Sequence, residues 1–157
     1  MKRAVARIVL SAVVACSAVS LAVPVAHAGT IESINEPIIQ KGMNRGTATG
    51  AWYASDTAFS LLNIKAVSYR PLMPNRVYRF WTVEVGGCDD GLGNSVALTR
   101  RSAETRVFIG TSRTVSVANN TMRCATGWQL GGTVMSWLII ATDQHTVLRR
   151  VPLLFAG

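Results

Sequence analysis

The chain has 157 residues, of which 49% are hydrophobic, so it is long enough to bury the core of one ordinary domain. Its 16 Lys and Arg residues against 8 Asp and Glu residues give a formal net charge of +8. These basic residues are scattered rather than gathered in one run, which argues against a nucleic-acid-binding protein and favours weak attraction to anionic partners.

The N-terminus has the features of a secretory signal peptide. A basic start is followed by an apolar stretch over residues 8–25, and Ala26-His27-Ala28 matches a small-x-small cleavage site. We therefore expect residues 1–28 to be removed and the mature chain to be secreted or periplasmic. Two alternatives stay open: an uncleaved anchor, because about 18 apolar residues just span a bilayer, and lipidation at Cys16.

The first part of the mature chain is less regular than the rest. Residues 29–50 are polar and rich in glycine, which predicts a flexible or edge-strand N-terminal segment with a short strand at residues 38–40. Residues 51–54 and 58–69 follow as strands, the second with the alternation of a half-buried strand. Residues 70–75 contain two prolines and are predicted to form a loop.

Residues 76–94 are the stretch around which the chain is organised. A run of β-branched and aromatic residues meets Gly86-Gly87 and leads Cys88 into a polar loop. Alternation places Val77, Arg79, Trp81, Val83 and Val85 on one face, and Arg76, Tyr78, Phe80, Thr82 and Glu84 on the other. Neither face is purely polar, so we expect both sides to be partly covered, as in a central strand of a sandwich.

The C-terminal half continues the pattern of short strands. We predict a strand at residues 96–98, a charged turn at Arg100-Arg101, and a hairpin between residues 105–110 and 113–118. Residues 133–142 are apolar on both faces and indicate a buried central strand. A tight turn at Asp143-Gln144 then leads into residues 145–155, where Pro152 is typical of an edge strand.

Cys88 and Cys124 are the two cysteines that remain after the signal. An even pair in an oxidising compartment predicts a disulfide, which would stabilise the fold by roughly 3–4 kcal/mol. The alternative is two reduced, buried thiols. Two cysteines so far apart do not make a structural zinc site, and no C-x-x-C motif is present.

About eight strands with frequent turn signals and almost no helical periodicity predict an all-β fold. We expect a two-layer antiparallel β-sandwich formed by residues 51–157 as a single β domain, closed by the disulfide. A small β-barrel is the alternative.

The most plausible binding surface is a cluster of aromatic and basic residues. Aromatic rings stack on sugars or apolar side chains, and arginines pair with carboxylates or phosphates. The competing interpretation is that tyrosines on strands belong to the core. The predicted binding residues are Tyr69, Arg70, Arg76, Tyr78 and Arg79.

The polar loop after Cys88 is a weak candidate for a calcium site. Asp89, Asp90 and Asn94 supply oxygen ligands of the kind that Ca²⁺ prefers, but the spacing of an EF-hand loop is missing. As a solvated turn the loop needs no metal, and we expect no cofactor.

Catalytic constellations are sparse. Glu84 and Asp89 are a conceivable carboxylate pair for a small hydrolase. His145 is the only histidine after residue 28, with Asp143 two residues away, but the G-x-S-x-G elbow of a serine hydrolase is absent. The P-loop and dinucleotide fingerprints are missing as well.

These observations favour an exported, non-catalytic binding module of a bacterial-type cell envelope or of the extracellular space. Its expected partner is a protein or an anionic envelope glycan or lipid, not nucleic acid, and after signal cleavage the chain is not expected to be an integral membrane protein. Two alternatives are a small carboxylate-dependent hydrolase and a structural subunit of a surface assembly.

Overall fold

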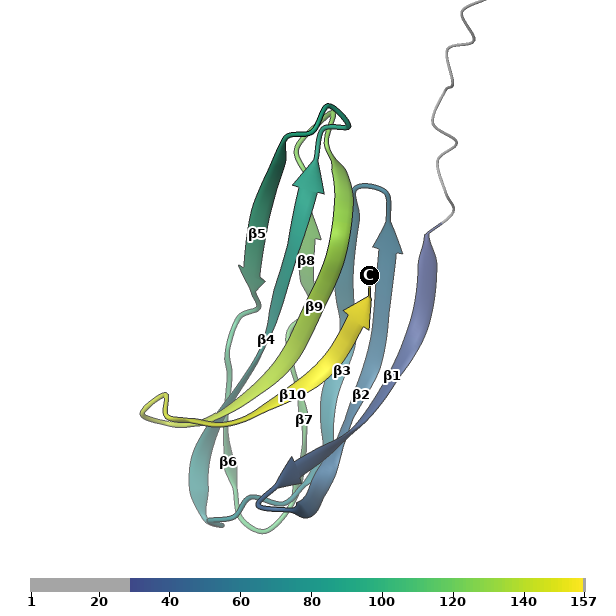
Figure 1. The fold of residues 1–157 in the computed structure, drawn as a ribbon. Coiled ribbons are helices and arrows are strands. Elements are labelled where there is room, and N and C mark those ends of the chain that lie inside the picture. Colours follow the sequence, from purple (N-terminus) through teal and green to yellow (C-terminus); the bar gives the residue numbers. More distant parts are fainter. Residues whose placement is uncertain (1–28, 157) are drawn as a thin grey trace, which may run out of the picture.

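The computed structural model describes residues 29–156, with the side chains described up to Leu154. The predicted signal peptide and Cys16 lie outside the described residues. The described chain is all β, without a helix, and it forms ten strands rather than about eight (Figure 1). The strands are β1 (Thr30–Gln40), β2 (Met43–Ser55), β3 (Ala58–Tyr69), β4 (Arg76–Asp89), β5 (Ser95–Arg101), β6 (Thr105–Ile109), β7 (Arg113–Ser116), β8 (Asn120–Arg123), β9 (Gln129–Thr142) and β10 (Val147–Ala156).

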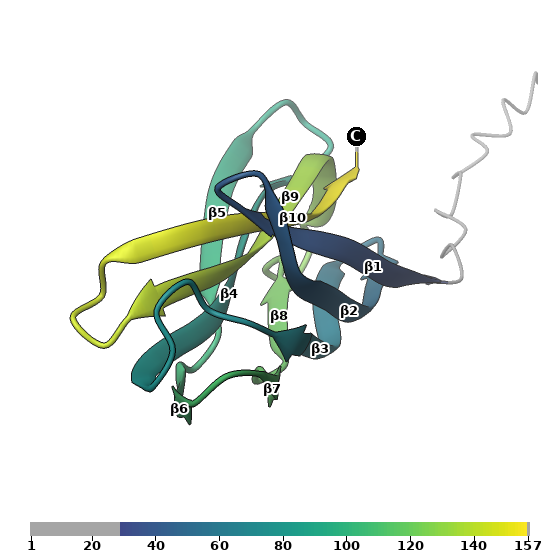
Figure 2. The ribbon, with the colours of Figure 1, turned by 90° about the horizontal axis from the view of Figure 1, so that it is seen from below.

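The strands form two open antiparallel sheets that pack against each other, so the predicted β-sandwich is confirmed and the closed barrel is not observed. One sheet has the order β1-β2-β3-β7, with β8 also paired to β3. The other has the order β10-β9-β4-β5, with β6 also paired to β4. We call them the β3 sheet and the β4 sheet. Figure 2 shows the two sheets from below.

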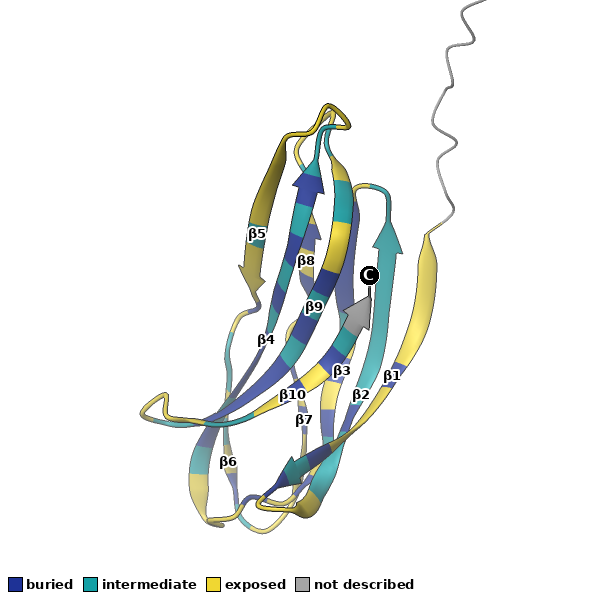
Figure 3. Cartoon of the chain, in the orientation of Figure 1, coloured by how far each residue is buried: buried dark blue, intermediate teal, exposed yellow. Residues whose placement is uncertain are grey.

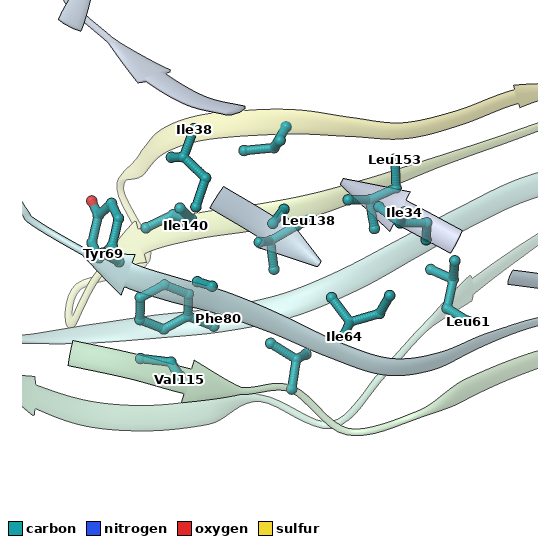
Figure 4. Close-up of a cluster of buried hydrophobic side chains, with 14 of the residues drawn as sticks. Ile34, Ile38, Leu61, Ile64, Tyr69, Phe80, Val115, Leu138, Ile140 and Leu153 are labelled. Atoms are coloured by element: carbon teal, nitrogen blue, oxygen red, sulfur yellow. The ribbon is translucent and has the colours of Figure 1, made fainter. Parts of the chain in front are cut away.

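The core fills the space between the sheets, because each sheet turns one apolar face inward. Phe80, Leu138 and Ile140 of the β4 sheet meet Leu61 and Ile64 of the β3 sheet in this cluster (Figure 4). Nearly all inward positions of β4 and β9 are buried, whereas β5 is exposed along almost its whole length (Figure 3). No helix among residues 29–156 has the length and apolar character needed to cross a membrane.

The predicted disulfide is confirmed. Cys88 and Cys124 are bonded, with their Cα atoms 5.7 Å apart. Cys88 is near the end of β4 and Cys124 directly follows β8, which is paired to β3. The bond therefore connects the two sheets near one end of the sandwich.

Residues 29–50, expected to be a flexible segment or an edge strand, form β1 and the start of β2. β1 is an edge strand of eleven residues, much longer than the predicted strand at residues 38–40. Only Ile34, Ile38 and Gln40 of β1 are buried, which explains why its hydrophobic pattern is weak. Pro152 lies within β10, which is also an edge strand.

The predicted hairpin of residues 105–118 is wrong. β6 pairs with β4 and β7 pairs with β3, so the turn at residues 110–112 carries the chain from one sheet to the other. The predicted charged turn at Arg100-Arg101 is also wrong, because both residues extend β5. Both errors have one cause, because local signals do not show that a long strand can pair with several short ones. β4 pairs with β5 and with β6, and β3 pairs with β7.

Candidate functional site

The structure does not gather the five predicted binding residues on one surface. Tyr69 and Tyr78 are buried in the core, in edge-to-face contact with their ring centroids 6.2 Å apart. Their rings therefore offer no surface to a partner. The three arginines are separate: Arg70 and Arg76 are exposed, and Arg79 is half-buried on the outer face of the β4 sheet.

Both tyrosine hydroxyls are used inside the protein. Tyr69 donates to Oε1 of Gln40 at 3.2 Å, and Tyr78 donates to the carbonyl oxygen of Met73. Burial raises the pKa of Tyr69 to about 12 and also raises the pKa of Tyr78. Both side chains therefore stay neutral, as core residues with a satisfied polar end do.

Glu84 points into the core rather than into a cleft. Its side chain is fully buried, and no donor within the described chain meets full hydrogen-bond geometry at either carboxylate oxygen, although the backbone of Leu61 interacts weakly with the group. Burial raises its pKa to about 7, and the backbone of Leu61 opposes this effect only in part. The hydroxyl groups of Thr82 and Ser136 on the same inner face are also unpaired. Because Glu84 lies in the core, the structure does not bring it to Asp89 across a cleft that a substrate could enter.

The outer face of the β4 sheet carries an apolar floor. Trp81 pairs in register with Ile139, and Val83 pairs with Trp137. Together with Ala141 these side chains form a second hydrophobic cluster, separate from the core. Antiparallel sheets usually turn a polar face to solvent, so an apolar outer face needs an explanation.

A groove runs along this floor. Its volume is about 360 Å³, and most of its lining is apolar. Val147 and Arg150 flank it on the side of the β9–β10 hairpin, and Val85 extends it along β4. The full lining is Trp81, Val83, Val85, Trp137, Ile139, Val147 and Arg150.

A network of charged side chains lies beside Trp81, one of the residues that line the groove. The guanidinium of Arg101 lies 4.2 Å from the centre of the Trp81 ring and forms an ion pair with Glu104. Arg79 lies two residues before Trp81 on the same face of β4. Its guanidinium forms ion pairs with Glu104, at 2.8 Å, and with Asp143, at 3.1 Å. Arg101 therefore covers the tryptophan ring.

The acidic groups of this network are fully engaged. Hydrogen bonds from Arg106, at 2.7 Å, are the main reason that the pKa of Asp143 falls to about 2. Arg79 is the main reason that the pKa of Glu104 is lowered. His145 lies 3.2 Å from both carboxylate oxygens of Glu104, so its partner is Glu104 and not Asp143. The geometry of a Ser-His-Asp triad is not present around His145.

The loop after Cys88 uses its carboxylates to hold its own shape. Asp90 accepts hydrogen bonds from the backbone N–H groups of Leu92 and Asn94, at 2.8 and 3.1 Å. The Asn94 side chain is the main reason that the pKa of Asp90 is lowered. Within residues 29–156, no group of three or more His, Cys, Asp or Glu side chains could hold a metal ion.

Sequence reasoning missed the groove, although its signal was visible. Residues 133–142 and one face of residues 76–85 are apolar where a solvent-facing strand would alternate. We interpreted that pattern as burial on both sides, whereas no further layer of the described chain covers the outer side. Searches against protein-family models, curated proteins and solved structures each find no match to this chain.

Proposed function

We propose that this chain is an exported binding module whose docking face is the outer side of the β4 sheet. The proposed partner is an acidic protein or an anionic polymer of the cell envelope or extracellular space. The observation that carries the proposal is the apolar, tryptophan-bearing groove on a face that is polar in most antiparallel sheets. Trp81, Ile139 and Ala141 are themselves buried, so the apolar surface that a partner can reach comes from Val83, Val85, Trp137 and Val147. Apolar surface of this kind is found at interaction sites.

The charges around the groove favour an acidic partner. Four arginines, Arg79, Arg101, Arg106 and Arg150, surround the face with only two carboxylates, those of Glu104 and Asp143. Arg150 takes part in none of the ion pairs between described residues. This excess of positive charge attracts an acidic partner and repels a second copy of the same face.

Export is supported by two features of different kind. A disulfide persists in oxidising compartments and is rare in the cytosol. The sequence over residues 1–28 has the order of regions found in secretory signals. A secreted or periplasmic binding module is therefore the function that we infer.

The test measures binding of the purified, disulfide-bonded chain to polygalacturonate and to its methyl-esterified, neutral form, alongside a pull-down from envelope extract. We expect binding to the charged form, or to an acidic protein in the extract, that weakens as salt is raised. Arg150→Glu is expected to weaken this binding about tenfold or more, since it reverses an unpaired charge at the groove. Arg123→Glu, an equal charge change on β8, is its control.

Trp137→Ala tests the apolar floor, with Phe108→Ala as the control because Phe108 is an exposed aromatic residue outside the groove. Truncating a central aromatic contact typically reduces affinity by about tenfold or more. Equal affinities for the Arg150→Glu and Arg123→Glu variants, together with unchanged binding by Trp137→Ala, would contradict the proposal.

A further inference from the structure

We propose that Arg45 and Arg70 form a second site, which binds a phosphate or sulfate group on the outer face of the β3 sheet. Thr47 and Val67 are paired in register beside the buried pair Ala48 and Ala66, so alternation places Thr47 and Val67 on the outer side. This site lies on the other sheet from the groove, and it does not depend on the proposed function.

The backbone places the two arginines next to each other. The N–H of Arg70 donates to the carbonyl oxygen of Arg45 at 2.7 Å, where β2 begins beside the end of β3. Ser68 has a φ of 51°, which breaks the alternation of β3, so that Tyr69 is buried and Arg70 is exposed. Between the arginines lies a hollow of about 320 Å³, which Asn44 and Ser68 also line.

Neither arginine has a carboxylate partner. No ion pair among the described residues involves Arg45 or Arg70, whereas Arg79, Arg101 and Arg106 are all paired. Two cationic side chains that line one hollow without an anion repel each other, and an anion placed between them reverses the sign of the interaction. The charge pattern therefore favours an anionic ligand.

The guanidinium of Arg45 also has a donor without an acceptor. Its Nε–H is buried and donates to no acceptor within the described chain. Its Nη2 donates to the thioether of Met43, a weak acceptor, at 3.7 Å, and its charge also acts on the buried Tyr69 hydroxyl. A buried donor without an acceptor is costly, and an oxyanion in the hollow would supply the missing oxygen.

A tetrahedral oxyanion fits these donors better than a carboxylate does. Its oxygens can accept from two guanidinium groups at once and from hydroxyl donors, and Thr47 and Ser68 line the same hollow as the two arginines. The two oxygens of a carboxylate match a single guanidinium fork. We therefore assign the site to a phosphate or sulfate group rather than to an acidic side chain.

The experiment is an NMR titration of the isotope-labelled, disulfide-bonded chain with inorganic phosphate, inorganic sulfate and acetate at constant ionic strength. We expect saturable changes for phosphate or sulfate in the amide signals of residues 44–47 and 67–70. Acetate is expected to bind at least about tenfold more weakly. The stronger of the two tetrahedral anions then indicates whether the natural ligand carries a phosphate or a sulfate group.

Arg45→Gln and Arg70→Gln are each expected to weaken the anion about tenfold or more, as loss of a charged hydrogen bond does. Arg123→Gln removes the same charge from β8 and should leave the titration unchanged. The absence of saturable changes in the unmodified chain, equal binding of acetate, or equal losses in all three variants would overturn the proposal. The first two outcomes do not depend on whether a variant folds.

Discussion

At the scale of single residues, Glu84 is the most unusual group in the described chain. It is a carboxyl group in the middle of a hydrophobic core, opposite Ser136 in register, and the backbone of Leu61 interacts with it only weakly. Burying an ionised carboxylate in this way is costly, so the group takes up a proton near neutral pH instead. The stability of the protein must therefore depend on pH.

Glu84→Gln tests this dependence. The folded pKa of about 7 lies above the ordinary value of 4.5, so the unfolded chain releases its proton first as the pH rises. The contribution of Glu84 to stability is then most favourable below pH 4.5 and falls by about 3 kcal/mol as the pH rises to about 7. The neutral amide removes this fall. Urea denaturation between pH 4.5 and pH 8 measures it, with the exposed Glu36→Gln as the control.

The network around Asp143 works at lower pH and does not disturb this test. The pKa of the Asp143 carboxyl is depressed to about 2, so the contribution of Asp143 to stability is present above about pH 4 and is lost as the pH falls towards 2. If the unmodified chain and Glu84→Gln show the same change of stability between pH 4.5 and pH 8, the buried carboxylate is not the cause.

At the scale of the elements, the start of β2 depends on Gly46. Its φ is 146°, and a Cβ at this position would lie 2.7 Å from the carbonyl oxygen of Val67 and 3.0 Å from the Cα atom of Tyr69. Both neighbours are backbone atoms, which cannot turn aside as a side chain can. Gly46 therefore permits the close approach of β2 and β3 beside the proposed anion site.

Gly46→Ala is expected to lower the free energy of unfolding by about 1–3 kcal/mol, because it combines backbone strain with a steric clash. Gly110→Ala is the matched control: its nearest contact would be 3.6 Å away, and we expect a change within about 0.5 kcal/mol. Chemical denaturation measures both. Equal stabilities of the two variants would show that β2 can move away from β3 at little cost.

The elements also show what the sequence could and could not predict. Alternation correctly divided β4 into two faces, but both faces are apolar, so the pattern did not say which one is inside. For this reason the binding surface predicted from sequence includes Tyr78, which is buried, and omits Trp137 and Arg150. Tyr69, at the end of β3, is buried as well. Local turn signals predicted the bend at residues 110–112 but not that β6 and β7 join different sheets, because pairing is decided by distant strands.

At the scale of the whole molecule, the fold class and the disulfide were predicted from sequence because each follows from global counts. Frequent strand and turn signals predict a sandwich, and two cysteines after the signal leave one possible pair. The position of the docking face follows from sheet order, which no local pattern records. The two open sheets are connected by several chain crossings and by one covalent link, Cys88–Cys124.

Replacing both cysteines by alanine tests how much that link contributes. The bond closes a loop between residues separated by 36 positions, and chain entropy predicts a loss of roughly 3–4 kcal/mol in the free energy of unfolding. The slope of the urea transition should increase, because the unfolded chain becomes less compact. Reduction of the unmodified chain should give the same values, which excludes a packing effect of the substitutions. The groove is built on β4, β9 and β10, and Val85 is the one residue of its lining that lies near Cys88 along β4. The folded variant should therefore keep the affinity for its acidic partner while losing stability. A variant that is fully folded and equally stable would show that packing between the sheets, rather than the disulfide, keeps the two layers together.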